Sequence, residues 1–249
     1  MKIVSIVIAT YNAEKVLPRC LKSIRSMKTD EIELVLVDGA SKDSTLSIIN
    51  DNKDIVDKFI SEPDKGIYDA WNKAIKLATG EWIMFLGADD MLFADAMKQV
   101  ISFAKSHQDN HYDLISCKMD LVDERENHKR YAGECFDYGK FCRRQLSFAH
   151  PAMLQNRSIF ERFGGFDIKY RIIADSEFYM RNGHNFTHCA FVDVVLARMQ
   201  QGGMSVSYRA IWEAYSMRSK HPDTPKMRNF IGAVKMSVVL FLSKLRSKM

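Results

Sequence analysis

Two adjacent aspartates, Asp89 and Asp90, follow an apolar run that is typical of a buried strand. Neighbouring carboxylates repel each other, so this pair calls for a compensating charge. A divalent cation would provide it, because Mg²⁺ and Mn²⁺ prefer hard oxygen ligands and share their coordination shell with substrate phosphates. Alternatively, Asp90 caps the next helix, as aspartate commonly does. The pair on its own leaves both interpretations open.

Two other aspartates could also take part in chemistry. Asp38 ends a second apolar run, before Gly39 and a turn rich in Ser and Asp. Its carboxylate could accept a hydrogen bond from a nucleoside, or it could stabilise the turn. Asp175 follows the apolar residues 172–174, where it could be a general base or a helix cap. Local sequence favours a helix cap over a general base for Asp175. For Asp38 it makes a turn-stabilising role at least as well supported as a hydrogen bond to a nucleoside.

The segments that must position these residues alternate between strand and helix patterns. Strand patterns cover residues 3–9, 33–37, 55–61 and 82–86, and helix patterns cover residues 13–27, 41–50 and 66–79. This order predicts an α/β fold with a Rossmann-like, mostly parallel sheet flanked by helices. Ligands of such sheets bind beyond the carboxyl ends of the strands. The polar residues Thr10 to Asn12, Asp38 to Ser41 and the Asp89–Asp90 pair all follow strand ends, so we expect them to converge on one site.

The second half of the chain has a less regular pattern. It predicts helices at residues 92–106, 158–163 and 175–181, and strands at residues 113–122 and 191–199. We expect one domain over residues 1–215, with a nucleotide-binding half at 1–90 and an acceptor half at 91–215. Residues 216–249 form a separate basic, amphipathic helical region in this interpretation.

Composition excludes several classes of protein. The chain has 249 residues, of which 47% are hydrophobic and 27% charged, so it is expected to fold around a substantial core. The net charge of +5 is too small to predict nucleic-acid binding. The five cysteines include no Cys-x-x-Cys pair, which favours a reducing compartment and a cytoplasmic protein. The apolar run at 3–9 is interpreted as a buried strand, and no run approaches the roughly 20 apolar residues of a bilayer span.

Four motifs in order resemble those of glycosyltransferase family 2. They are Ser5-Ile6-Val7-Ile8-Ala9-Thr10-Tyr11-Asn12, Val37-Asp38-Gly39-Ala40-Ser41-Lys42-Asp43-Ser44-Thr45, Glu62-Pro63-Asp64-Lys65-Gly66-Ile67-Tyr68-Asp69-Ala70-Trp71-Asn72-Lys73 and Gly87-Ala88-Asp89-Asp90. The likeness is close over about the first 90 residues and looser through Asp175. Four motifs at matching intervals are far more specific than any one of them.

The resemblance implies a GT-A fold and an inverting transfer of sugar from a nucleotide-diphosphate donor, usually a UDP-sugar. It implies a nucleoside site at Thr10, Tyr11 and Asp38, with Tyr11 against the base. We place Asn12 in the same donor site, bordered by Asp64 and Lys65. Asp89 and Asp90 correspond to the element that touches the ribose and the Mn²⁺ or Mg²⁺ on the diphosphate. Because Gly87 stands where many members have the first aspartate, Asp90 is our first choice for the metal ligand.

On the acceptor side, the resemblance implies that Asp175 is the catalytic base. The acceptor hydroxyl needs a base as it attacks, and one displacement opposite the diphosphate inverts the anomeric centre. His150, in Phe148-Ala149-His150-Pro151, resembles a family position near the donor phosphates or the acceptor; a structural histidine is an equal alternative. Residues 202–205 resemble a family loop near the active site, and an ordinary turn is the alternative.

The end of the chain has an amphipathic helical pattern. Its apolar positions are Phe230, Ile231, Val234, Val238, Leu242 and Leu245, and basic residues flank them. The helix could pack on the core, but we favour contact with the inner face of the cell membrane. The family resemblance also implies that the sugar is transferred to a glycan or lipid-linked acceptor in surface-polysaccharide synthesis.

Two other functions remain as alternatives. A sugar nucleotidyltransferase shares this architecture, but it needs a Gly-rich basic loop that residues 10–13 do not provide. A non-catalytic nucleotide-sugar-binding module could also keep the fold, because fold does not fix function. Retention of Asp38, Asp90 and Asp175 favours the enzyme.

Overall fold

A computed structural model describes residues 1–200 and 207–246, with side chains through residue 242. The strands are β1 (Val4–Thr10), β2 (Ile32–Asp38), β3 (Lys58–Ser61), β4 (Trp82–Gly87), β5 (Met91–Leu92), β6 (Leu114–Val122), β7 (His128–Ala132), β8 (Met153–Asn156) and β9 (Cys189–Gln200). The α-helices are α1 (Leu17–Arg25), α2 (Thr45–Asp51), α3 (Ile67–Leu77), α4 (Ala94–Ser106), α5 (Tyr138–Cys142), α6 (Arg157–Phe163), α7 (Ala174–Asn182), α8 (Tyr208–Lys220) and α9 (Lys226–Arg246).

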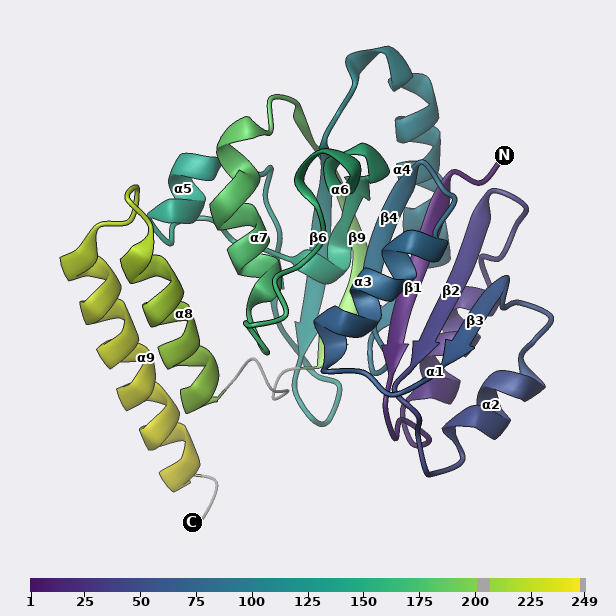
Figure 1. The fold of residues 1–249 in the computed structure, drawn as a ribbon, viewed down its shortest axis with the longest axis horizontal. Coiled ribbons are helices and arrows are strands. Elements are labelled where there is room, and N and C mark those ends of the chain that lie inside the picture. Colours follow the sequence, from purple (N-terminus) through teal and green to yellow (C-terminus); the bar gives the residue numbers. More distant parts are fainter. Residues whose placement is uncertain (201–206, 247–249) are drawn as a thin grey trace.

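Within the described residues, nine strands form one mixed sheet. Its order is β3-β2-β1-β4-β8-β6-β9-β5, with β7 beside β6. Figure 1 shows β1, β2 and β3 side by side at one end of the sheet. The pairs β1–β2, β1–β4 and β2–β3 are parallel, as the alternating sequence pattern predicts, and β8 is antiparallel to both β4 and β6. The predicted α/β fold class is therefore confirmed.

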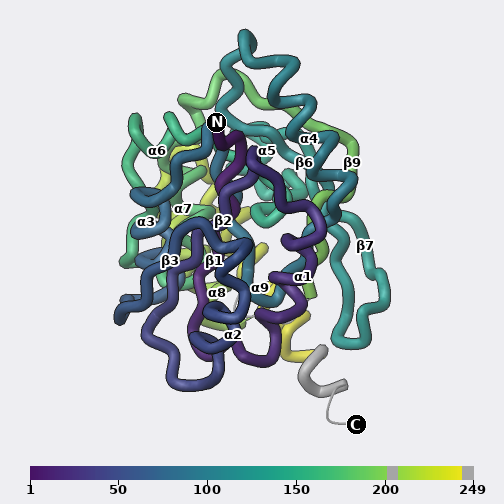
Figure 2. The backbone as a smooth tube through the Cα atoms, turned by 90° about the vertical axis from the view of Figure 1, so that its right-hand side faces the viewer, coloured from purple at the N-terminus to yellow at the C-terminus, as the bar shows by residue number. Residues whose placement is uncertain are grey.

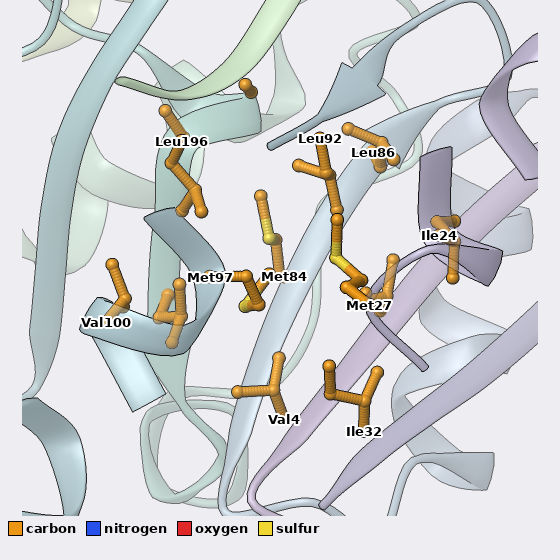
Figure 3. Packing of buried hydrophobic residues seen from close by; sticks show 14 of the residues in the cluster. Val4, Ile24, Met27, Ile32, Met84, Leu86, Leu92, Met97, Val100 and Leu196 are labelled. Atoms are coloured by element: carbon orange, nitrogen blue, oxygen red, sulfur yellow. The ribbon is translucent and has the colours of Figure 1, made fainter. Parts of the chain in front are cut away.

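Helices cover both faces of the sheet, as Figure 2 shows edge-on, with α1 and α4 on one side and α3, α6 and α7 on the other. Alternate residues of β1 enter different cores, because successive strand side chains point to opposite faces. Ile6 and Ile8 pack in the cluster that includes α1 and α4, whereas Val7 packs in the cluster that includes α3 and α7. Figure 3 shows the first cluster, with Met84 of β4 and Met97 of α4 near its centre.

The predicted elements differ from the observed ones mainly at helix starts and in the second half. Helix α1 begins at Leu17 rather than at residue 13, since Pro18 is tolerated only in the first turn. The short β7, β8 and α5 were not predicted. Nor was α8, whose range includes the predicted boundary between residues 215 and 216.

The last two described helices form an antiparallel pair beside the sheet domain (Figure 1). Ile211 of α8 packs against Ala233 and Leu240 of α9. Met217 of α8 packs instead in the cluster that contains Tyr68 and Trp71, so α8 joins the helix pair to the sheet domain. No helix in the described part of the chain combines the length and the hydropathy that a bilayer crossing requires.

A buried glutamate ties the first three strands to the loop before β4. Glu33 is 2% exposed, and its carboxylate accepts hydrogen bonds from the Ser5 hydroxyl and from both the backbone and the hydroxyl of Thr79. Lys58 of β3 lies 2.9 Å from the same carboxylate. Burial alone would raise the pKa of Glu33, but the bonds from Ser5, Thr79 and Lys58 lower it to about 2.

We expect Glu33→Gln to destabilise the fold by roughly 2–3 kcal/mol at neutral pH, because it loses a carboxylate that the folded state stabilises. The depressed pKa means that this contribution is present above the unfolded-state pKa and disappears as the pH falls toward about 2. Denaturant unfolding of both proteins should therefore show a stability difference that narrows below about pH 4.5. Glu31→Gln is the control, because Glu31 pairs with Lys105 at the surface. A pH-independent difference would contradict the assignment.

Candidate active site

The carboxyl ends of three parallel strands meet at one edge of the sheet. Thr10 of β1 is in register with Asp38 of β2, and Ala9 is in register with Gly87 of β4. The chain turns away at each of these points because polar residues and glycine follow the apolar strand residues. The predicted convergence of the three polar segments is thus built into the register of the sheet.

Asp38 anchors this edge from beneath. Its side chain is fully buried and accepts hydrogen bonds from the hydroxyls of Thr10 (3.1 Å), Ser41 and Ser61 (2.7 Å), and from the backbone N–H of Ser41. Burial raises the pKa of Asp38, but these bonds outweigh it and leave the pKa below its usual value. Asp38 therefore makes the contacts that stabilise its turn. Asp38 and Thr10 are both buried, and each directly precedes a loop, the one with Gly39 and the one with Tyr11.

Tyr11 and Asp64 face each other across Gly39. Tyr11 is 66% exposed, so its ring is available for stacking. A Cβ at residue 39 would lie 2.5 Å from Oδ2 of Asp64 and 3.3 Å from the Tyr11 ring, so a larger residue there would displace the Asp64 side chain. Asp64 also accepts a hydrogen bond from the backbone of Gly66 at 2.8 Å. This arrangement offers an aromatic face beside a fixed carboxylate acceptor.

Asn12 and Lys65 flank this arrangement. Asn12 has a positive φ of 48°, and its side chain accepts a bond from the Lys42 N–H at 2.9 Å. Its own N–H donates to Ser41, so Asn12 joins the loops after β1 and β2. Lys65 is exposed, and its backbone N–H donates to Asp69. Lys65 is therefore an exposed cation that follows Asp64 in the chain.

Asp89 and Asp90 converge above Gly87. A Cβ at residue 87 would lie 2.7 Å from Asp89 Oδ1 and 2.8 Å from Asp90 Oδ2. Asp89 is exposed, whereas Asp90 is 3% exposed and accepts a bond from the Gly87 N–H at 3.0 Å. Helix α4 begins only at Ala94, so Asp90 is not its N-cap. The two carboxylates share one side of a tight turn.

The residues of this turn fit a divalent cation. Asp90 Oδ1 is buried and has no hydrogen-bond partner in the described part of the chain. Burial, and then the charge of Asp89, raise the pKa of Asp90 to about 7. No cluster of three or more His, Cys, Asp or Glu side chains in the described ranges forms a complete protein metal site. A cation held here would need further ligands from a substrate, as Mg²⁺ and Mn²⁺ commonly take from phosphates.

A cleft of about 1390 Å³ connects this turn with the second half of the chain. Asp89 and Asp90 lie on its wall together with His150 and Asp175. The sequence therefore predicted four residues that the structure brings to one cavity. Thr10, Tyr11, Asn12, Asp38, Asp64 and Lys65 lie outside this wall, at the adjoining strand ends.

Asp175 is held by a tyrosine from α3. The Tyr68 hydroxyl lies 3.0 Å from Asp175 Oδ1 and 2.8 Å from the carbonyl of Ile172. Burial, and then the charge of Asp175, raise the pKa of Tyr68 far above its usual value, so the hydroxyl stays protonated as a donor. The same Oδ1 accepts from the Ser176 N–H at 2.7 Å. Asp175 Oδ2 is the oxygen left for a substrate hydroxyl.

His150 lies in an aromatic enclosure. Its ring stacks on Phe85 with an interplanar angle of 12° and lies 5.3 Å from the Trp71 ring. A ring nitrogen lies 3.2 Å from the amide nitrogen of the buried Gln155. Burial lowers the pKa of His150, which keeps the imidazole neutral near Asp175. The buried packing of the ring fits the structural alternative, and a position near the donor phosphates or the acceptor stays a prediction for this residue on the cleft wall.

Several cleft residues could not be predicted from the sequence. Tyr68 stood within a recognised motif, but no local pattern shows that it reaches Asp175, which is 107 positions away. Arg125 and Arg130 come from the β6–β7 hairpin, which was not predicted, and Met236 comes from α9. These contacts depend on tertiary packing. The predicted active-site loop at residues 202–205 lies outside the described residues.

Known proteins resemble this chain in sequence and in fold. The family model described as "Glycosyl transferase family 2" matches residues 5–164. A "PGL/p-HBAD biosynthesis glycosyltransferase" of Mycobacterium bovis strain BCG is 36% identical over 207 residues, which cover 81% of this chain and 78% of that protein. A "Poly(ribitol-phosphate) beta-glucosyltransferase" of Bacillus spizizenii is 33% identical over 113 residues, 42% of this chain and 18% of that protein.

Two solved structures share the fold. S. aureus TarS 1–349 in complex with UDP-GlcNAc aligns with a TM-score of 0.71 and 20% identity, over 92% of this chain and 69% of that one. The mannosyltransferase PcManGT of Pyrobaculum calidifontis, in complex with GDP-Man and Mn²⁺, aligns with a TM-score of 0.66 and 18% identity. That alignment covers 98% of this chain and 75% of the other.

The bond between Tyr68 and Asp175 leads to a prediction about turnover. Tyr68→Phe should lower kcat about tenfold or more, because a charge-assisted bond that orients the carboxylate is lost. Donor affinity should stay within about twofold, since the bonds of the Tyr68 hydroxyl in the described part of the chain go to Asp175 and the Ile172 carbonyl. Steady-state kinetics with separate donor-binding measurements check both values.

Tyr138→Phe is the matched control, because the Tyr138 hydroxyl donates to Asp223 at 2.8 Å away from the cleft. The positioning role of Tyr68 is wrong if kcat is unchanged in Tyr68→Phe, or if the control variant loses as much.

Proposed function

The chain belongs to glycosyltransferase family 2, and we propose that it is an inverting, metal-dependent enzyme that moves a sugar from a UDP-linked donor to an acceptor hydroxyl. As a member of that family it is a glycosyltransferase with a GT-A fold. The observation that carries the proposal is the cleft in which the Asp89–Asp90 turn and Asp175 line one cavity. One end suits a diphosphate with its cation, and the other offers a base.

The donor is proposed to lie across the strand ends. Tyr11 stacks on the base, and Asp64 accepts a hydrogen bond from its edge, while Thr10 and Asp38 hold both loops from below. Asn12 and Lys65 border the nucleotide. The complex of TarS with UDP-GlcNAc supports a uridine donor, since that protein shares the fold over 92% of this chain. In PcManGT the nucleotide is GDP, so GDP is the alternative nucleotide to compare with UDP in binding experiments.

The carboxylates of Asp89 and Asp90 are proposed to hold Mn²⁺ or Mg²⁺ against the donor diphosphate. The bound cation would stabilise the negative charge that develops on the departing diphosphate. Asp90 contributes the unpartnered Oδ1, and Asp89 contributes the more accessible carboxylate. The Mn²⁺ in the PcManGT complex supports this choice of ion.

Asp175 is proposed to take the proton of the acceptor hydroxyl. Tyr68 and the Ser176 N–H fix Oδ1, so Oδ2 can accept that proton as the oxygen attacks the anomeric carbon. A neutral His150 donates or accepts a hydrogen bond near the donor phosphates without adding a charge. Attack from the side opposite the diphosphate inverts the anomeric configuration.

The acceptor is proposed to be a glycan or lipid-linked molecule used in surface-polysaccharide or glycolipid synthesis. The names of the mycobacterial and Bacillus relatives support this class. The outer face of α9 supports a peripheral position on the inner face of the cell membrane, because it exposes apolar residues along one side. These are Met227, Phe230, Ile231, Val234, Val238, Phe241 and Leu242.

Calorimetry with UDP tests the donor and metal proposals. The wild type should bind UDP at least about tenfold more tightly with Mn²⁺ than without it. Asp89→Asn and Asp90→Asn should each lose most of that gain, because each removes a charge that faces the cation. Asp95→Asn is the control, since Asp95 is exposed on α4 and pairs only with Lys98. A full metal-dependent gain in both Asp89→Asn and Asp90→Asn would contradict the assignment.

Vesicle flotation tests the membrane proposal. Val234→Glu combined with Val238→Glu should reduce binding to vesicles of phosphatidylcholine and phosphatidylglycerol about tenfold or more, because two charges enter the apolar face. Leu46→Glu combined with Phe59→Glu is the matched control, as these exposed side chains lie elsewhere. Truncation after Lys226 is a poorer test, because removal of α9 would expose the buried Ile211 and could change the fold. Equal binding by the wild type and the α9 variant would contradict membrane contact through this face.

A further inference from the structure

Two arginines border a second cavity, which lies next to the cleft and beneath α9. Arg144 follows α5 in the chain, and Arg218 comes from α8. Both line a cavity of about 270 Å³, whose other walls are mostly apolar. This small cavity shares Phe148 and Met236 with the main cleft, so the two spaces adjoin.

Arg218 is buried although it carries a full charge. It is 7% exposed, and its Nη1 donates to the carbonyls of Phe141 (3.0 Å) and Cys142 (3.3 Å). The guanidinium also lies 5.1 Å from the centre of the Phe141 ring. These contacts engage one nitrogen and one face of the group, and the partners in them are all neutral.

Arg144 is held against α9 in a strained turn. Its φ is +56°, a conformation that a long side chain seldom adopts. A Cβ on Gly232 would lie 3.3 Å from Arg144 Nη1, so the glycine lets the guanidinium approach the helix. Nη2 donates to Asn229 at 3.1 Å, and Nε is buried without a partner in the described part of the chain. Strain of this kind tends to accompany functional sites.

Neither arginine has an acidic partner. Among the described residues, no Asp or Glu side chain lies within salt-bridge distance of Arg144 or Arg218. Burial lowers the pKa of Arg218 to about 10, and the neighbouring charge of Arg144 adds to that effect. Burial also lowers the pKa of Arg144. A buried charge such as that of Arg218 is costly without a counterion, and the nearby charge of the half-buried Arg144 adds to that cost.

The cavity lies beside the catalytic base. Its wall includes Ile173 and Ser176, which stand on either side of Asp175 in the turn that begins α7. An anion placed between the arginines would therefore belong to the molecule whose hydroxyl meets Asp175. The donor diphosphate lies with the Asp89–Asp90 turn, which lines only the main cleft.

We propose that Arg144 and Arg218 bind a phosphate group of the acceptor, close to the hydroxyl that receives the sugar. The assignment of the phosphate to the acceptor rests on the proposed function. The anion site itself depends only on the two arginines and their cavity. Arginine forks match phosphate oxygens with paired charge-assisted hydrogen bonds. The acceptor is then a phosphate-bearing glycan or lipid. Its apolar part would lie along Met236 of α9, which lines both cavities.

Binding of inorganic phosphate to the full chain, measured by calorimetry in EDTA, tests the site. EDTA removes the cation that the donor site needs, so phosphate reports on the arginines. The wild type should bind phosphate, and Arg144→Gln should weaken that affinity about tenfold or more. Arg143→Gln should change it less than about twofold. This matched control removes the same charge from an exposed neighbour whose side chain bonds to Gln145.

The proposal is overturned if the wild type binds no phosphate, or if Arg143→Gln weakens binding as much as Arg144→Gln does. UDP binding with Mn²⁺ is measured on the same proteins and should be unchanged in Arg144→Gln, which shows that the fold is intact. If UDP fails to bind the wild type while phosphate binds it, the proposed donor function fails and the anion site stands. Arg218→Gln is a second variant rather than the first, because Arg218 also holds the Phe141 and Cys142 carbonyls.

Vesicles distinguish the source of the phosphate. Flotation compares phosphatidylcholine vesicles with and without phosphatidylglycerol for the wild type and Arg144→Gln. If the site takes the acceptor phosphate, the preference for phosphatidylglycerol is the same in both proteins, as we propose. If Arg144→Gln loses that preference, the phosphate belongs to a bilayer headgroup, which overturns the acceptor assignment and retains the anion site.

Discussion

The parallel register of β1, β2 and β4 is the constraint on which the rest of the structure depends. It brings Thr10, Asp38 and Gly87 to one edge and so gathers four carboxylates, Asp38, Asp64, Asp89 and Asp90, around the same strand ends. Four hydrogen bonds stabilise the charged carboxylate of Asp38, whereas Asp90 Oδ1 has no partner in the described residues. A divalent cation would relieve the repulsion between Asp89 and Asp90, which is why we propose a metal site at this turn.

The acceptor side is built differently. Its groups come from separate segments, with Tyr68 from α3, His150 from the loop before β8 and Asp175 from α7, and packing alone brings them together. Helix α9 places Met236 on the wall of the cleft, and Arg144 and Arg218 line the adjoining small cavity. In the proposed function, the edge of the sheet therefore holds the donor, whereas side chains from α3, α7 and the segments packed around them hold the acceptor.

Much of the donor half could be predicted from the sequence because its signals are local. Buried parallel strands appear as continuous apolar runs such as residues 3–9, and polar turns follow them at strand ends. The acceptor half gave weaker signals. Strand β8 has four residues and inserts antiparallel between β4 and β6, which no local pattern specifies. Contacts such as Tyr68 to Asp175, or Arg144 to Gly232, join distant positions, so they emerge only when the chain is folded.

The stereochemistry of transfer tests the central claim most directly. Donor turnover can be followed by NMR with an α-linked UDP-sugar and an acceptor hydroxyl, comparing the wild type with Asp175→Asn. A single displacement with Asp175 as base predicts a β-linked product from the wild type and transfer slower by about a hundredfold or more in the variant. An α-linked product, or undiminished transfer by Asp175→Asn, would contradict the account, because the cleft would then work without the base that its geometry provides.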